Sequence, residues 1–195
     1  MAAGKNPYRI LVAGANDKIC GFITEILPKG DYEISFRAET AGLARRRMLE
    51  TPEDLVIINA PLREEFGTQL ALDLADTNAG VLLVVPGEVF EQVCAKVEDE
   101  GVLTLAKPVS RQGFYGAVKL LTAMREKLMR LERQNHALQE KMMDIRTVNR
   151  AKWLLIERMK MTEQEAHYFI EKQAMDLRVS RREMAENIIR AYDMG

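Results

Sequence analysis

The stretch Asp54-Leu55-Val56-Ile57-Ile58-Asn59-Ala60-Pro61 holds four consecutive large apolar residues, which a polar residue and a proline then stop. Such an unbroken apolar run is typical of a strand in a parallel sheet that helices cover on both faces. Similar short runs recur in the first 118 residues, with helical patterns between them. The predicted strands are Arg9–Ala13, Glu33–Ala38, Leu55–Ile58, Val81–Val85 and Val102–Leu105. We therefore expect a doubly wound α/β domain over residues 1–118, with functional residues at the carboxyl ends of its strands.

The residues at these strand ends resemble those of a response-regulator receiver domain, which has a flavodoxin-like fold. A receiver places two acidic residues after its first strand, whereas this chain has Ala13-Gly14-Ala15-Asn16 and its first carboxylate only at Asp17. Asn59 occupies the position of the phosphoaccepting aspartate, and Val85-Pro86 stands where a receiver has Ser or Thr. The lysine that a receiver carries after its fifth strand is kept as Lys107. The resemblance thus implies the receiver fold without most of its chemical groups.

Phosphoryl transfer to a carboxylate needs an ionised nucleophile and a divalent metal that neutralises the phosphate charge. The amide of Asn59 has no carboxylate oxygen, and Gly14 and Ala15 offer no hard oxygen ligand to Mg²⁺. We therefore expect a pseudo-receiver that is not phosphorylated on Asp and holds no metal or cofactor. Either Asn16 or Asp17 is expected to cap the helix that follows.

From residue 121 onward the apolar pattern changes to heptads. Its members are spaced alternately by three and four residues: Leu121, Met124, Leu128, Leu131, Asn135, Leu138, Met142 and Ile145. A strict 3.5-residue repeat favours a coiled coil over a helix packed on its own domain. Residues 119–145 are therefore expected to form a coiled-coil dimerisation helix, with an intrachain helical hairpin as the alternative. Asn135 falls at an a position, which favours a parallel two-stranded coil.

The charge of the chain is divided unequally between its two parts. The whole chain carries 28 basic and 29 acidic residues, but residues 1–118 have a net charge of −5 and residues 119–195 a net charge of +4. An acidic front and a basic back predict two modules, of which the second would bind a polyanion. No stretch approaches the ~20 apolar residues of a membrane span, so we expect a cytoplasmic protein. Cys20 and Cys94 are expected to be buried as small apolar residues.

The last third of the chain contains Arg150-Ala151-Lys152-Trp153-Leu154-Leu155-Ile156-Glu157-Arg158-Met159, then Thr162-Glu163-Gln164-Glu165-Ala166, then Ala174-Met175-Asp176. In order and spacing these runs resemble the ANTAR domain, a three-helix RNA-binding module of bacterial transcription antiterminators. The resemblance covers Asp144 to Met194, and Trp153 departs from it by replacing the usual Gly. It implies an RNA-binding domain, a three-helix bundle, over residues 146–195.

The helices of this region are marked by capping boxes at Thr162–Glu165 and Ser180–Glu183. Three short amphipathic helices can bury their apolar stripes only against one another. Among the residues at positions that match the family, we expect Ala151, Ala166 and Met175 to pack between helices. We also expect Trp153 to pack against a neighbouring helix, and a role in the approach of RNA stays open as the alternative.

Basic and aromatic side chains remain outside the predicted helix packing. Basic residues reach phosphates, and aromatic rings stack on the unpaired bases of RNA loops. Lys152 and Arg158 lie at positions that match the family, and with Arg178 they are the leading expected contacts. The full set of candidate RNA-binding residues is Arg150, Lys152, Trp153, Arg158, Tyr168, Arg178 and Arg182.

A receiver-like domain followed by a coiled coil and an ANTAR domain resembles the antitermination regulators of the amidase and nitrate-assimilation systems. The resemblance implies a dimer that holds paired hairpins of a leader RNA, so that the terminator does not form. Because Asn59 cannot accept a phosphoryl group, we expect a regulatory protein partner to control the activity of this protein.

Two other classes of function remain. One is a dimeric protein-interaction module without RNA binding. An enzyme in the front domain is disfavoured, because His136 and His167 both lie outside it and no nucleophile and paired carboxylates converge at a strand end. DNA binding by the basic tail lacks a helix-turn-helix pattern.

Overall fold

The computed structural model describes residues 6–16 and 18–193, which divide into two compact units, residues 1–129 and 130–195. The first unit contains five parallel strands in the order β2-β1-β3-β4-β5. They are β1 (Tyr8–Gly14), β2 (Tyr32–Ala38), β3 (Leu55–Asn59), β4 (Gly80–Pro86) and β5 (Leu103–Lys107). Between them lie α1 (Lys18–Ile26), α2 (Ala41–Glu50), α3 (Thr68–Ala75), the short 3₁₀ turn η1 (Gly87–Val89) and α4 (Phe90–Val97). The predicted α/β receiver-like fold is confirmed.

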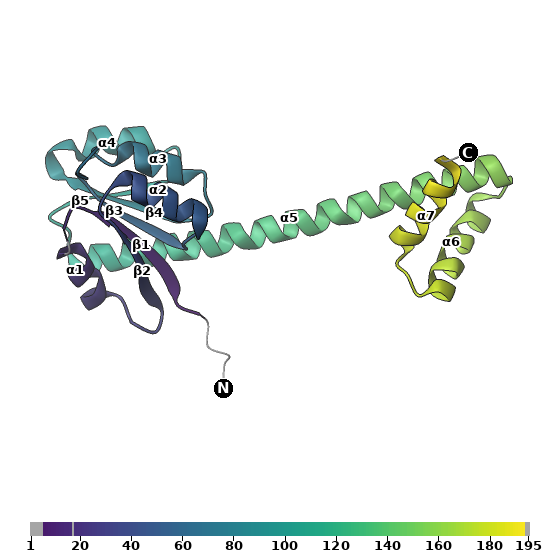
Figure 1. Cartoon of the computed structure of the whole chain (residues 1–195), viewed down its shortest axis with the longest axis horizontal. Coiled ribbons are helices and arrows are strands. Elements are labelled where there is room, and N and C mark those ends of the chain that lie inside the picture. The colour runs from purple at the N-terminus through teal and green to yellow at the C-terminus, as the bar shows by residue number, and fades with distance from the viewer. Residues whose placement is uncertain (1–5, 17, 194–195) are drawn as a thin grey trace. The chain divides into compact units, whose positions relative to one another are not determined.

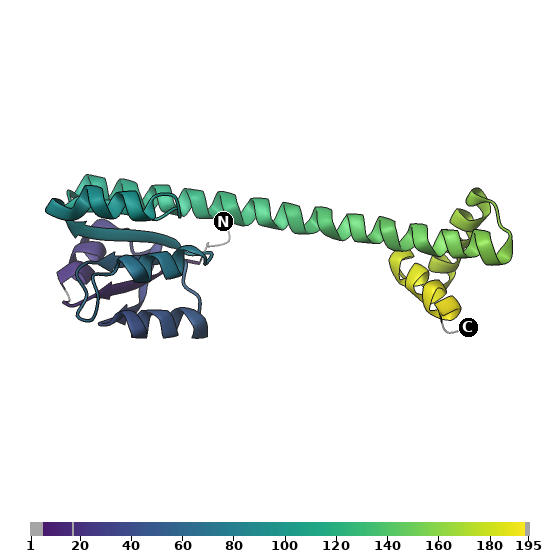
Figure 2. The same cartoon turned by 90° about the horizontal axis from the view of Figure 1, so that it is seen from above.

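Helices cover both faces of this sheet (Figures 1 and 2). Neighbouring residues of a strand point to opposite faces, and in β3 both sets are buried. Val56 and Ile58 pack in one cluster with residues of α2, α3 and α4. Leu55 and Ile57 pack in a second cluster with residues of α1 and with the beginning of the long helix that follows β5. Two covered faces are the physical reason why this strand is apolar at four consecutive positions.

The long helix is α5 (Arg111–Met159), 49 residues that contribute to both units. It starts before the predicted boundary at residue 118, and its first turns bury Phe114 and Val118 against the sheet. Leu121 is only 5% exposed, so its assignment to the coiled-coil seam is wrong. The space for it comes from Gly80, where an added Cβ would lie 3.4 Å from the Cβ of Leu121 and 2.9 Å from Cδ2 of Leu55.

Polar contacts extend this anchorage of α5 by one more turn. The hydroxyl groups of Tyr32 and Thr122 lie 3.2 Å apart, and Arg125 pairs with Asp54 at 2.6 Å. The other apolar heptad residues are open to solvent. Their exposed fractions lie between 48% and 61%: Met124, Leu128, Leu131, Leu138, Met142 and Ile145. Together with Asn135 we call these residues the exposed seam.

The second unit joins the end of α5 to α6 (Glu163–Leu177) and α7 (Arg181–Asp193). Figure 1 shows α6 and α7 beside the last turns of α5. Its core is small, with three alanines among the buried residues of the cluster: Ala151, Leu155, Ala166, Ile170, Ala185 and Ile188. The apolar stripes of the three helices pack against one another, as predicted. In the part of the chain that the structure describes, no helix combines the length and apolarity needed to cross a bilayer.

Candidate nucleic-acid interface

The core of the second unit determines which residues face solvent. Ala151 and Ala166 are completely buried, so the expectation that they pack between helices is confirmed. The same expectation is wrong for Met175, which is 78% exposed. Met175 follows the buried Ala174, and one residue along a helix turns the side chain by about 100°. Its thioether therefore lies on the outer side of α6.

The two exposed aromatic residues of the unit also point away from the core. Trp153 stands two residues from both Ala151 and Leu155, and Tyr168 stands two residues from both Ala166 and Ile170. A step of two residues turns a side chain by about 200°, which places it opposite the buried face. Trp153 is 63% and Tyr168 65% exposed. In the single chain Trp153 is therefore mostly open to solvent and does not belong to the buried core of the unit.

The capping box predicted at Thr162 is complete, and one of the two bonds of the box predicted at Ser180 is present. Glu165 N donates to Thr162 Oγ1 at 3.3 Å, while Thr162 N donates to Glu165 Oε2 at 2.8 Å, so the first capping box is complete. These bonds from Thr162 lower the pKa of the Glu165 carboxyl. At the next helix, Glu183 N donates to Ser180 Oγ at 3.1 Å.

Basic residues occupy both turns that flank α6, and both adopt a left-handed backbone. Lys160, after α5, has φ of 58°, and Arg178, after α6, has φ of 56°. Glycine is the usual residue at such helix ends because a Cβ is disfavoured there. Backbone bonds hold the second turn, since Val179 N donates to the carbonyl of Ala174 at 3.0 Å. Arg178, a predicted RNA contact, is thus exposed on a fixed but strained turn.

Lys152, another predicted RNA contact, forms an ion pair within the protein. Its Nζ lies 2.7 Å from Oε1 of Glu163, and only 16% of its side chain is exposed. The hydrogen bond from Lys152 holds the pKa of the Glu163 carboxyl below its usual value. The pair connects α5 to the start of α6. A phosphate would therefore have to compete with this carboxylate for the ammonium group.

Arg182 is engaged in a similar way. Its guanidinium lies 3.0 Å from Asp144 on α5 and 2.9 Å from Glu186 on its own helix, and these bonds raise its pKa. Arg182 and Lys152 border the same hollow, which has a volume of about 650 Å³. The hollow is lined by Glu140, Asp144, Ile145, Val148, Asn149, Lys152, His167, Ser180, Arg181 and Arg182. It is therefore the place where predicted contacts from two helices come together.

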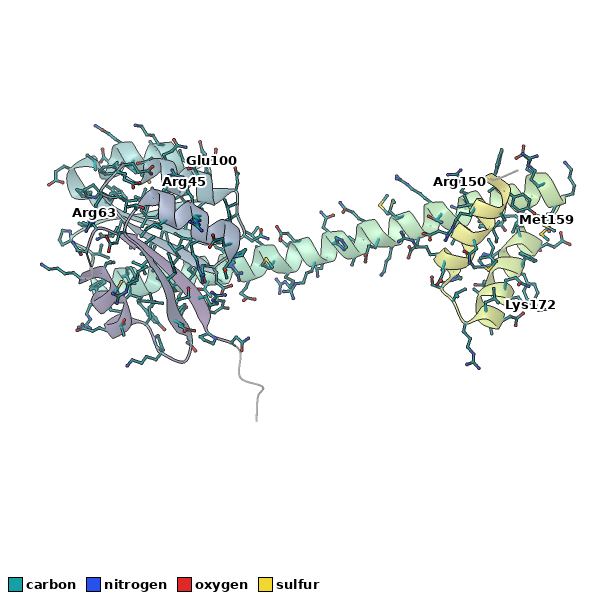
Figure 3. The ribbon with its side chains drawn as sticks, in the orientation of Figure 1. Arg45, Arg63, Glu100, Arg150, Met159 and Lys172 are labelled. Carbon is teal, nitrogen blue, oxygen red and sulfur yellow. The ribbon has the colours of Figure 1, made fainter. Side chains whose placement is uncertain are left out.

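The remaining basic candidates lie elsewhere on the unit. Arg150 and Arg158 are exposed on α5. Figure 3 marks Arg150 and Met159 on α5 and Lys172 on α6. The structure therefore distributes the candidate cations and aromatic rings over several faces of the bundle, while Lys152 and Arg182 line the same hollow.

Sequence reasoning missed the acidic partners of these cations. Glu163 follows Lys152 by eleven residues, and Asp144 precedes Arg182 by 38. Neither spacing is a contact distance along one helix, where pairs form at three or four residues. Only the packing of the helices brings them together.

In the front domain, the degenerate receiver site lies at the carboxyl ends of the strands, as expected. Asn59 ends β3 in register with Gly14 and with Val84. Lys107 donates from Nζ to the carbonyl of Ala60, and burial lowers its pKa. Asn59 and Lys107 line a hollow of about 350 Å³ together with Asn16.

The helix that follows β1 is capped by one of the two expected residues. Asn16 Oδ1 accepts a hydrogen bond from Lys18 N at 3.2 Å, whereas Asp17 lies outside the described residues. Within the described ranges, no group of three His, Cys, Asp or Glu side chains is placed to hold a metal. Cys20 is buried as expected, but Cys94 is only half-buried.

The basic run Arg45-Arg46-Arg47 on α2 is paired with carboxylates of the front domain. Arg45, which Figure 3 marks, pairs with Asp73 at 2.6 Å and with Glu65 at 3.1 Å. Arg46 pairs with Glu50 one turn away. These carboxylates neutralise the run within an acidic domain.

Comparison with known proteins identifies the second unit. Residues 136–189 match the family model of the ANTAR domain. The chain carries an ANTAR domain. The match starts inside the segment predicted as coiled coil, ten residues before the expected boundary at 146.

The whole chain is similar to a curated regulator. Transcriptional regulatory protein PdtaR of Mycobacterium tuberculosis is 28% identical over 188 residues, which cover 94% of this chain and 90% of that protein. The sequences from two strains, CDC 1551 and H37Rv, match equally well. The ANTAR family is not an enzyme family, and this relative is a transcriptional regulatory protein.

Solved structures resemble the front domain. The signal receiver domain of an HD domain-containing protein from Pseudomonas fluorescens superposes with a TM-score of 0.57 at 22% identity, covering 67% of this chain and 97% of that domain. A CheY-like receiver domain from Methanospirillum hungatei gives a TM-score of 0.54 at 21% identity and covers 62% of this chain and 98% of its own. The front domain therefore shares the receiver fold with these structures, and sequence identities this low show the fold alone.

Proposed function

We propose that this protein is an RNA-binding transcription antiterminator of the response-regulator type. The ANTAR match over residues 136–189 is the observation that carries the proposal. The exposed Arg150, Arg158 and Arg178 supply charge for phosphates, and Tyr168 supplies an open ring for an unpaired base. The ligand would be a leader-RNA hairpin, held so that transcription continues past the terminator.

The exposed seam supports a homodimer. Its apolar members are half open to solvent in the single chain, and a parallel partner would bury them around Asn135. A dimer presents two ANTAR domains, so that binding of the first hairpin raises the effective concentration of the second. Two adjacent hairpins in one transcript are therefore the preferred ligand.

Control would not use Asp phosphorylation. The acceptor position is an amide, Asn59, and Lys107 is bonded to a backbone carbonyl beside it. We infer that a regulatory protein partner instead binds the front domain and masks or releases the RNA-binding end in the cytoplasm.

The proposal is tested by measuring binding of the purified protein to a leader RNA with two short hairpins, at two salt concentrations. A single-hairpin RNA and a duplex DNA serve as ligand controls. We expect preferential, salt-sensitive binding of the paired hairpins. The double variant Lys152→Ala/Arg158→Ala should lose at least about tenfold in affinity and lower the salt slope by about 2, one for each phosphate contact.

The matched control variant is Arg46→Ala/Lys96→Ala, which removes the same charge from exposed helix positions of the front domain. It should bind like the wild type. No affinity for hairpin RNA at either salt concentration, in a sample confirmed to be dimeric, would instead support the rival function, a dimeric interaction module without RNA binding.

A further inference from the structure

Trp153 lies on a face of α5 that its own domain leaves open. The ANTAR core is formed by the opposite face of the helix, through Ala151 and Leu155. Within the described chain, 63% of the indole remains in contact with solvent. A large apolar ring is unfavourable in contact with water, and Trp is enriched at the surfaces where proteins bind one another.

The position of Trp153 along α5 aligns it with the exposed seam. It follows Asn135 by 18 residues, which is about five turns of an α-helix. It follows Met142 by eleven residues, which is about three turns. Both spacings return a side chain to nearly the same face. On a straight helix Trp153 therefore lies close to the face of Asn135 and Met142, and in the heptad register that places Asn135 at a it falls at an e position, on the flank of the exposed seam.

The seam needs such an extension. With Leu121 buried in the front domain, the exposed seam runs only from Met124 to Ile145, about three heptads. That is the lower end of the length at which a heptad pattern specifies a coiled coil. Asn135 within it favours one register at a cost in stability. An additional aromatic anchor on the same face would offset that cost.

We propose that Trp153 belongs to the homodimer interface, where its indole packs against α5 of a second copy of this chain. The inference rests on the dimer of the proposed function and extends its contact surface from the coiled coil into the ANTAR domain. It withdraws Trp153 from the RNA contacts expected from sequence. Because the contact would continue beside each RNA-binding unit, it would also fix the spacing of the two hairpin sites.

The chain has a single tryptophan, so the emission of Trp153 reports this contact directly. A dilution series of the full-length wild type, without RNA, is followed by fluorescence and by sedimentation equilibrium. We expect the emission to shift to shorter wavelength over the same concentration range in which the dimer forms. Trp153→Ala should raise the dimer dissociation constant at least about tenfold.

The matched control is Tyr168→Ala, which removes an equally exposed aromatic residue from the outer face of α6. It should leave the dimer unchanged. Circular dichroism of both variants confirms that the helices remain folded, since Ala is the strongest helix former.

Three outcomes would overturn the inference. A dimer with solvent-exposed emission and an unaffected Trp153→Ala variant would reject it and leave the proposed function intact. Emission that changes only when hairpin RNA is added would return Trp153 to the RNA contacts. A protein that is monomeric at every concentration would reject both the inference and the proposed dimer.

Discussion

The two units of this protein relate their candidate functional residues to their folds in opposite ways. In the front domain, the residues that form the core of the sheet are different from the candidate functional residues at the strand ends. Ile57 and Ile58 are buried between the helix layers, while Asn59 occupies the functional position next to them. The receiver fold is therefore complete although its acidic groups are replaced.

In the ANTAR domain, several candidate binding residues also take part in the fold. Lys152 connects α5 to α6 through Glu163, Arg182 connects α7 to α5, and Arg178 makes the turn between α6 and α7. The core beneath them is small. Substitutions at the strand ends should therefore leave the front domain folded, whereas substitutions of the candidate binding residues should also affect the stability of the second unit.

The largest effect is expected from Leu155→Ala, because Leu155 is one of the few large side chains in the small core. A buried Leu→Ala change costs about 2–5 kcal/mol, which should unfold much of the ANTAR domain. Denaturant unfolding followed by Trp153 emission should show an earlier transition. Leu82→Ala, fully buried in the front domain, should leave that transition in place. A single shared transition for both variants would contradict the division into two units.

Arg178→Gly should separate stability from binding. Glycine relieves the left-handed backbone at φ of 56°, so the free energy of unfolding should stay equal or rise by up to about 1 kcal/mol. Hairpin affinity should fall about tenfold because a phosphate contact is lost. Thermal unfolding and RNA binding are measured on the same sample. Unchanged affinity would remove Arg178 from the interface.

Glu163→Gln should strengthen RNA binding by about threefold, because it releases Lys152 from a competing carboxylate. Glu157→Gln removes the same charge from an exposed position of α5 and serves as the control. Equal gains in both variants would show a general charge effect instead.

The same pair predicts a pH dependence of stability. Lys152 lowers the pKa of Glu163, so the contribution of the pair is present above the unfolded value of about 4.3. It is lost as the pH falls through the lower pKa of the folded state. Glu163→Gln should therefore flatten the acid side of the stability curve, which unfolding at a series of pH values would measure.

The smallest effect is expected from Asn59→Asp, which restores a carboxylate at the acceptor position. Gly14 and Ala15 still offer no second carboxylate, so Mg²⁺ should not bind tightly and a small phosphoryl donor should not label the variant. Mass spectrometry measures the label. Phosphotransfer from a cognate kinase to the wild type, but not to Asn59→Ala, would overturn the assignment as a pseudo-receiver.

Local pattern was sufficient for much of this structure. Each predicted strand lies within two residues of an observed one, and the unbroken apolar runs of β3 and β4 correctly indicated strands covered on both faces. The capping box at Thr162 formed as expected because its partners are three residues apart. The prediction that Met175 packs between helices was wrong. Its match to a family position does not show whether a neighbouring helix covers the side chain.

The sequence by itself determined the order of the elements, the receiver-like fold and the ANTAR domain, because periodicity and motif spacing are properties of the chain alone. The tertiary structure decided where the seam begins, since Leu121 fits a heptad equally well but fills the space beside Gly80. It also decided which cations are paired, because Glu163 and Asp144 reach Lys152 and Arg182 only across packed helices. The exposure of Trp153 likewise depends on which face of α5 the other two helices cover.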